Sequence, residues 1–109
     1  MGRGREPPAP GGGMCAKIYR QEGHVVVAAC DRELLGRTLR EGNVRLEVSE
    51  AFYEGESVTR EELRAALAGA TTANLVGEEA VACAREGGFV EESGVVWIEG
   101  VPHAQFFRV

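Results

Sequence analysis

The chain has 109 residues, 27% of them charged, and a formal net charge of −5 at pH 7. This length is enough for one domain and too short for two. No stretch of about 20 apolar residues is present, which excludes a membrane-spanning helix, and the acidic total argues against a general nucleic-acid coat protein.

The first element expected is an N-terminal extension over residues 1–13. It holds three of the four prolines, five glycines and almost no apolar side chain, so it cannot bury enough surface to offset the entropy of ordering. It also lacks the apolar run of a signal peptide. We predict that residues 1–13 are disordered and that residues 14–109 form one globular domain, with Met14 as an alternative start.

Two paired strands are expected next. Residues 15–20 lead through a turn at 21–23 into the unbroken apolar run 25–29. A β-branched run of this kind is typical of a central strand covered on both faces, and the short connection predicts a hairpin.

Asp31 then stands where an N-cap would start a short helix, because its side chain can accept hydrogen bonds from free amides of the first turn. After a turn at residues 41–43, apolar and charged residues alternate over 44–48, which is the period of a half-exposed strand. Residues 49–53 predict a single helical turn.

Two longer helices follow. Thr59 and Glu62 have the spacing of a capping box, in which each side chain bonds the other residue's amide, and residues 63–70 carry an apolar stripe at helical spacing. A second helix is predicted over residues 75–86, with acidic residues in its first turn and a basic one in its last, as the helix dipole favours.

Strands over residues 95–99 and 103–109, joined by a turn at 100–102, complete the chain. This order favours an α+β fold. The prediction is a single domain of about five mostly antiparallel strands, two hairpins plus one, with two main helices packed on one face.

The segment between the two long helices is the first candidate ligand site. Thr72, Asn74 and Gly77 lie where a helix is expected to begin, and free amides with a partial positive charge there favour an anion. The alternative is that Thr72 or Asn74 only caps the helix. The GxxxxGK[ST] and GxGxxG nucleotide-binding loops are absent.

The second candidate site is the stretch 100–107. His103 and Gln105 are two residues apart on an expected strand and therefore point to one face, where they can bind a base edge or an anion, or transfer a proton. The alternative is a strand end whose polar groups bond nearby backbone. His24 is expected in an exposed turn, and without a third ligand at recognisable spacing we predict no zinc site and no cofactor.

The three cysteines, Cys15, Cys30 and Cys83, contain no CxxC pair. All lie in apolar stretches, where free cysteine behaves as a small hydrophobe. Reduced thiols fit a cytoplasmic protein without a disulfide-linked partner. Cys30 at a strand end is a candidate nucleophile, since amide dipoles favour a thiolate, but the adjacent Asp31 carboxylate opposes that role.

Charge divides unevenly along the chain. Residues 14–45 carry six bases against four acids, a net +2, while residues 46–109 carry four arginines against twelve glutamates, a net −8. Sixteen of the seventeen acids are Glu and eleven of the twelve bases are Arg, a bias that suits a thermophilic protein and that genomic base composition also produces.

The bases of the first half are candidates for one RNA-binding face. Arg37, Arg40 and Arg45, with bases of the first hairpin and Tyr19 as a stacking surface, suit contact with an RNA backbone. The alternative is that these arginines are solvated and paired with neighbouring glutamates.

Four stretches carry a family resemblance: KIYR, VVVAACDRELLGRTLREGNVRLEVSEAFYEGE, TTANLVGEEAV and GVPHAQFFRV. Together they resemble the archaeal family catalogued as domain of unknown function 424, over residues 14–109. The family has no established activity, and the resemblance implies a short archaeal cytosolic protein with a connection to translation. The positions that match the family pattern are Asp31, Leu35, Gly36, Thr72, Asn74, Gly77, His103, Ala104 and Gln105.

The leading hypothesis from the sequence is a non-catalytic binding module associated with RNA or the translation machinery. The alternative is an anion- or small-molecule-binding protein, or an enzyme, that uses a helix N-terminus at residues 71–77 with His103 and Gln105. It requires the two stretches to meet at one pocket. A third interpretation is a protein-interaction domain whose acidic second half is the docking face. Oligomeric state stays open.

Overall fold

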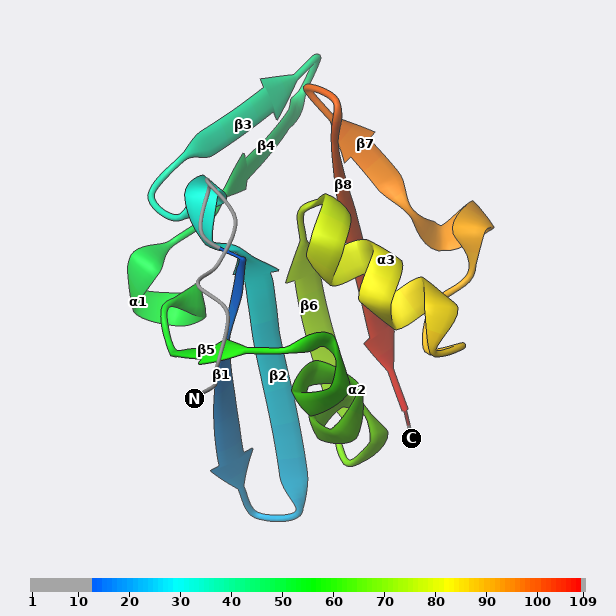
Figure 1. Cartoon of the computed structure of the whole chain (residues 1–109). Coiled ribbons are helices and arrows are strands. Elements are labelled where there is room, and N and C mark those ends of the chain that lie inside the picture. Colours follow the sequence, from blue (N-terminus) through cyan, green and yellow to red (C-terminus); the bar gives the residue numbers. More distant parts are fainter. Residues whose placement is uncertain (1–12, 109) are drawn as a thin grey trace, which may run out of the picture.

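A computed structural model describes residues 13–108. Six strands form one sheet in the order β5–β1–β2–β6–β8–β7 (Figure 1). Of the predicted N-terminal extension, residues 1–12 lie outside the described part. Neighbouring strands are antiparallel except for the parallel pair β2 and β6. The strands are β1 (Met14–Gln21), β2 (His24–Asp31), β5 (Glu56–Val58), β6 (Thr72–Val76), β7 (Val96–Ile98) and β8 (Val101–Phe107).

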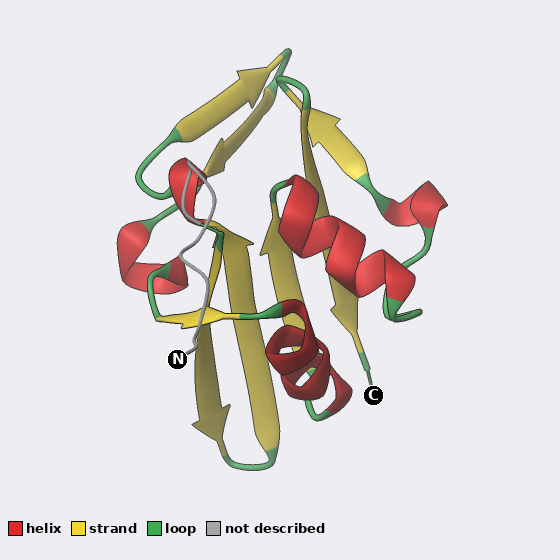
Figure 2. Ribbon diagram, in the orientation of Figure 1, coloured by secondary structure: helices red, strands yellow, loops and turns green. Residues whose placement is uncertain are grey.

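Two helices, α2 (Arg60–Ala68) and α3 (Glu78–Glu86), cover one face of this sheet (Figure 2). Leu63 and Leu67 of α2 are fully buried in a core that includes Val27 and Ala29 of β2. None of the helices within residues 13–108 is long and apolar enough to cross a membrane. The predicted packing of two main helices on one face is confirmed.

The predicted capping box at the start of α2 is also confirmed. The Thr59 hydroxyl accepts a hydrogen bond from the Glu62 amide at 3.1 Å, and the Glu62 carboxylate accepts one from the Thr59 amide at 2.8 Å. Such a cap satisfies two amides that a helix start otherwise leaves free.

The opposite face of the sheet is covered over only part of its area. The covering elements are the 3-10 turn η1 (Arg32–Leu34), a separate hairpin of β3 (Thr38–Glu41) and β4 (Val44–Glu47), and the short helix α1 (Glu50–Tyr53). Ala28 and Cys30 of β2 are fully buried in this second core. Strand β2 is therefore covered on both faces, as its apolar run predicts.

The β3–β4 hairpin is attached to the end of the β7–β8 hairpin (Figure 1). The Glu41 carboxylate accepts a hydrogen bond from the Glu99 amide, and the Glu99 carboxylate accepts one from the Arg40 amide, both at 2.6 Å. These two reciprocal bonds hold the two hairpin tips together.

A second 3-10 turn, η2 (Glu92–Gly94), joins α3 to β7.

The α+β class and the mostly antiparallel sheet are confirmed, but the predicted count of about five strands is too low. The described residues form eight strands. The three that the sequence did not predict are β3, β5 and β6. The last strand also begins earlier than predicted, at Val101, with Pro102 inside it. The expected short helix from Arg32 is only the single turn η1.

The largest correction concerns residues 71–77, which were expected to lead into a helix. Residues 72–76 form β6 between β2 and β8, and the helix begins only at Glu78. Thr71 extends the pairing, since its hydroxyl bonds both the amide and the carbonyl of Val25 at 2.9 Å. Pairing with a strand more than forty residues away overrides the local helical pattern.

Asp31 is a cap, but of a different helix from the one predicted. Its side chain makes no hydrogen bond to η1. Its two carboxylate oxygens instead accept from the Glu79 amide at 3.1 Å and the Ala80 amide at 3.0 Å, at the start of α3. Gly77, with a φ of 112°, is the only residue that fits beside it, because a Cβ there would overlap the carboxylate.

We therefore expect Asp31→Ala to lower the free energy of unfolding by about 1–3 kcal/mol, because two amides of α3 lose their acceptors. Asp31→Asn should cost less, since it keeps one acceptor oxygen and removes a carboxylate whose pKa burial raises. Urea unfolding measures both. The control is Glu33→Ala, which removes an exposed acid that lines one hollow together with Asp31. An equal loss in Asp31→Ala and Glu33→Ala would contradict the capping role.

Candidate functional site

The strand registers place two rows of four side chains on the sheet face opposite α2 and α3. We call these eight residues the open sheet face. One row is Lys17, Ala28, Asn74 and Gln105, and the other is Tyr19, Val26, Thr72 and Phe107. Each row crosses β1, β2, β6 and β8 in turn, so residues far apart in the sequence become neighbours.

A pocket of about 410 Å³ lies at the β6–β8 end of these rows. It is lined by Thr72, Asn74, Gln105, Phe106 and Phe107. Asn74 and Gln105 are directly opposite each other, and Phe107 is 70% exposed. The two candidate stretches therefore do meet at one pocket, but on a sheet and not at a helix N-terminus.

The pocket offers hydrogen bonding and an aromatic surface but no ionisable side chain. The amides of Asn74 and Gln105 each donate and accept, and the Thr72 hydroxyl does both. Phe107 presents a ring to which a planar group can stack. This set suits a flat, polar, uncharged group and supplies no acid or base for proton transfer.

The β1 end of the open sheet face is occupied by α1. The Tyr19 hydroxyl donates to the Phe52 carbonyl at 2.7 Å, the Lys17 ammonium donates to the Ala51 carbonyl at 3.0 Å, and the rings of Tyr19 and Phe52 stack at 5.5 Å. These contacts satisfy carbonyls that the end of α1 leaves free. Tyr19 and Lys17 thus position α1 and are not free to bind a ligand in this arrangement.

His103 points to the same face as Gln105, as the spacing predicts, but does not line the pocket. It lies in the neighbouring row, opposite Val76 and Val96, where its Nε2 atom is buried without a hydrogen-bond partner. Burial lowers the pKa of its imidazole. The structure thus separates His103 from the three polar residues that meet.

Gly77 lies away from the pocket as well, at the N-terminus of α3. The hollow beside it, about 330 Å³, is lined by the carboxylate-bearing residues Asp31, Glu33, Glu78 and Glu79. Asp31 already occupies the free amides of the helix start. An anion would meet four acidic side chains there, so the expected anion site at this helix N-terminus is not supported.

The arginines of the first half do not form one surface with β1. Arg40 and Arg45 are directly opposite each other on the β3–β4 hairpin, and Arg37 just precedes it, all three exposed. Arg20 lies near the far end of the sheet, beside the β1–β2 turn (Figure 1). Within residues 13–108 the ion pairs are Arg60–Glu86 and Arg85–Glu92, so the three hairpin arginines have no carboxylate partner there.

Comparison with known proteins fits this architecture. The family model described as "Protein of unknown function (DUF424)" matches residues 19–109. The chain belongs to the DUF424 family. The crystal structure of an uncharacterized conserved protein from Methanopyrus kandleri is similar to this DUF424 chain, with a TM-score of 0.71 and 29% identity over 85% of this chain and 89% of that one. No curated protein matches it.

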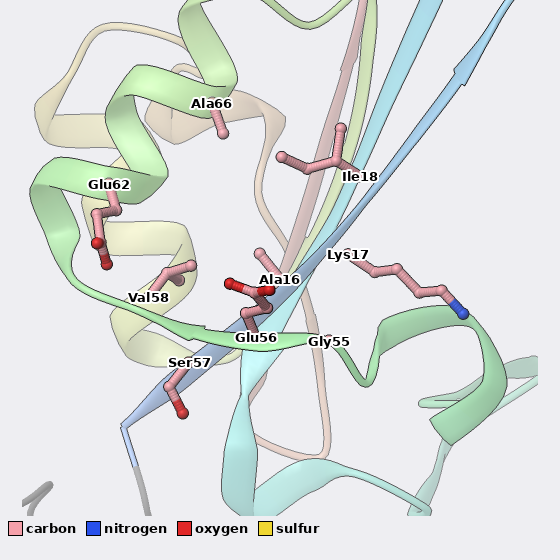
Figure 3. Close-up of a pocket in the computed structure, with 9 residues that line it drawn as sticks. All are labelled: Ala16, Lys17, Ile18, Gly55, Glu56, Ser57, Val58, Glu62 and Ala66. Carbon is pink, nitrogen blue, oxygen red and sulfur yellow. The ribbon is translucent and has the colours of Figure 1, made fainter.

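The DUF424 chain has a second pocket, of about 470 Å³, between β1, β5 and α2 (Figure 3). Glu56 and Glu62 bring carboxylates to it, beside apolar side chains such as Ile18 and Val58. The Lys17 ammonium is directed toward α1 instead. This pocket contains no predicted site residue, and its carboxylates would repel a phosphate.

Sequence reasoning missed Phe107, the exposed ring of the pocket. The signal was available, because Phe107 continues the two-residue period of His103 and Gln105. It also missed the pairing of Cys15 with Cys30, whose sulfur atoms lie 3.9 Å apart. The hydrogen bond with Cys15 and burial raise the pKa of the Cys30 thiol, which opposes its role as a nucleophile. Within residues 13–108 no three potential metal ligands gather.

Burial of His103 predicts a pH dependence of stability for the DUF424 chain. Because its folded pKa lies below the ordinary value of 6.5, the unfolded chain binds this proton more readily, so stability is lost as the pH falls below about 6.5. We expect His103→Gln to flatten the decline in unfolding free energy between about pH 7 and pH 5. The matched control is His24→Gln, at an exposed position. A decline unchanged in His103→Gln would show that this residue is not its source.

Proposed function

We propose that this DUF424 chain is a non-catalytic module that binds single-stranded RNA on its open sheet face. The observation that supports it is the meeting of Thr72, Asn74 and Gln105 beside the exposed ring of Phe107. Proteins recognise unpaired RNA bases by stacking them on aromatic rings and by hydrogen-bonding their edges. An open sheet is a surface on which both contacts can be made at once.

The pocket matches the chemistry of a nucleobase. Directly opposite residues on antiparallel strands have Cβ atoms about 4.5–5.5 Å apart, so the amides of Asn74 and Gln105 can reach neighbouring atoms of one base edge. Base edges present donors and acceptors side by side, and an amide supplies both. Phe107, in the adjacent row, supplies the stacking surface.

The phosphate contacts are assigned to the β3–β4 hairpin. Like charges directly opposite on a hairpin are destabilising, and Arg40 and Arg45 are such a pair without a carboxylate partner in residues 13–108. A phosphodiester between them would relieve that repulsion. Because the whole chain is acidic, we expect binding to be weak and strongly dependent on salt.

A small neutral ligand, such as a free nucleoside, is the alternative occupant. The pocket volume of about 410 Å³ falls in the usual range of small-molecule sites, and no cation lines it. Catalysis has less support, because none of the five lining side chains ionises near neutral pH.

The base contacts are tested by fluorescence anisotropy with a labelled single-stranded RNA of mixed sequence. We expect Phe107→Ala to weaken binding by about tenfold or more, since stacking on an aromatic ring contributes about 1–3 kcal/mol per base. Asn74→Ala and Gln105→Ala should each weaken it less. The matched control is Trp97→Ala, which removes a half-exposed ring (49%) from a different pocket beside α3. Equal effects of Phe107→Ala and Trp97→Ala would refute this site.

The phosphate contacts are tested by repeating that titration over a series of salt concentrations. Charge reversal by Arg40→Glu or Arg45→Glu should weaken binding and lower the slope of log affinity against log salt by about 0.7 for each lost contact. Arg20→Glu is the control, because Arg20 lies beside the β1–β2 turn, away from the β3–β4 hairpin, and alternates onto the sheet face that carries α2 and α3. If RNA does not bind at low salt while a nucleoside raises the thermal midpoint, the small-molecule alternative replaces the RNA function.

A further inference from the structure

Cys15 and Cys30 face each other across β1 and β2 as directly opposite residues. Their sulfur atoms are 3.9 Å apart, and both side chains are free thiols that are fully buried. We propose that these two residues are an oxidisable dithiol that a peroxide converts to an intramolecular disulfide. The inference is independent of RNA binding, because neither residue lines the pocket on the open sheet face.

The backbone already has the separation that a disulfide requires. Directly opposite residues of an antiparallel pair have Cα atoms about 4.5–5.5 Å apart, and disulfides span Cα separations of about 4.4–6.8 Å. Closing the gap between Cys15 and Cys30 therefore requires side-chain rotation and little movement of the strands.

The two thiols also differ in reactivity. Either thiol can donate in the hydrogen bond between them. With Cys30 as the donor, this bond lowers the pKa of the Cys15 thiol, although burial opposes the shift. The same hydrogen bond and burial raise the pKa of Cys30. Cys15 is thus the attacking thiolate and Cys30 the resolving thiol, since only the thiolate is strongly nucleophilic.

The oxidation balances with one peroxide for two thiols. The Cys15 thiolate attacks a peroxide oxygen, the O–O bond breaks, and hydroxide leaves and takes up a proton, which gives a sulfenic acid and water. The Cys30 sulfur then attacks the Cys15 sulfur, the S–O bond breaks, and the Cys30 proton leaves with the hydroxyl as a second water. Both cysteines are oxidised, and the peroxide is reduced.

A peroxide reaches Cys15 when the chain segment over it opens. The Cys15 sulfur lies 3.4 Å from the Tyr53 carbonyl at the end of α1, and its strand edge is paired there with the three-residue strand β5. Short elements of this kind open locally at a lower free energy than the whole fold. A small oxidant therefore fits the site better than a protein thiol.

Cys83 serves as an internal reference. It lies in α3, in the core on the other side of the sheet, and its thiol donates to the Arg60 carbonyl at 3.4 Å. Burial raises the pKa of the Cys83 thiol. The reaction should therefore leave one of the three thiols unchanged.

The test treats the folded full-length chain with hydrogen peroxide, then unfolds it, alkylates the remaining thiols and digests it with trypsin. Lys17 and Arg20 lie between Cys15 and Cys30, so trypsin separates the two cysteines unless they are bridged. We expect one remaining thiol in place of three, a bridged peptide pair that contains Cys15 and Cys30, and full recovery of thiols on reduction by dithiothreitol.

Two variants complete the design. Cys83→Ser should give the same bridged peptides, and Cys30→Ser should give none while Cys15 becomes further oxidised. Three thiols that survive in the folded wild-type chain, under conditions that oxidise the unfolded chain, would overturn the proposal. So would a bridge to Cys83 or between two molecules. The wild-type measurement decides even if a variant fails to fold.

Discussion

The buried carboxylate of Asp31 is the constraint on which this arrangement depends. Strands β2 and β6 run parallel and end side by side, with Cys30 beside Val76. The next residues, Asp31 and Gly77, therefore meet at the C-terminal ends of these two central strands. The Asp31 carboxylate accepts hydrogen bonds from two amides at the start of α3. Only glycine at position 77 leaves room for this carboxylate. This contact fixes α3 on the central parallel pair. It also occupies the free amides of this helix N-terminus, which an anion would otherwise use.

On the sheet face opposite α2 and α3, the polarity and burial of the side chains change from one row to the next. Cys15, Cys30 and Val76 are buried in the core beneath α1, η1 and the β3–β4 hairpin, and the half-buried His103 continues their row. The adjacent row replaces these with Lys17, Ala28, Asn74 and Gln105. Polar side chains thus begin in this row, where Ala28 is still fully buried and only the β6–β8 end is uncovered.

The sequence was sufficient for elements whose signals are local. The capping box at Thr59 and Glu62, the β1–β2 hairpin and the turn at residues 49–53 all depend on neighbours in the chain. β6 has no such signal, because Thr72–Val76 is defined by β2 and β8 on its two sides. For the same reason the spacing of His103 and Gln105 predicted their shared face correctly. It did not predict that Gln105 would be exposed and His103 half-buried, with its Nε2 atom buried.

The polar residues of the pocket are costly in a strand that serves only the fold. Asn is among the residues depleted in strands, and Asn74 lies in the middle of β6, flanked by strands on both sides. A β-branched residue would pair better there, and an amide directly opposite Gln105 gains little from exposure to water. Phe107, 70% exposed, adds apolar surface that water disfavours. These features weaken the sheet but suit a planar polar ligand, which is why we propose binding on the open sheet face and not at either helix.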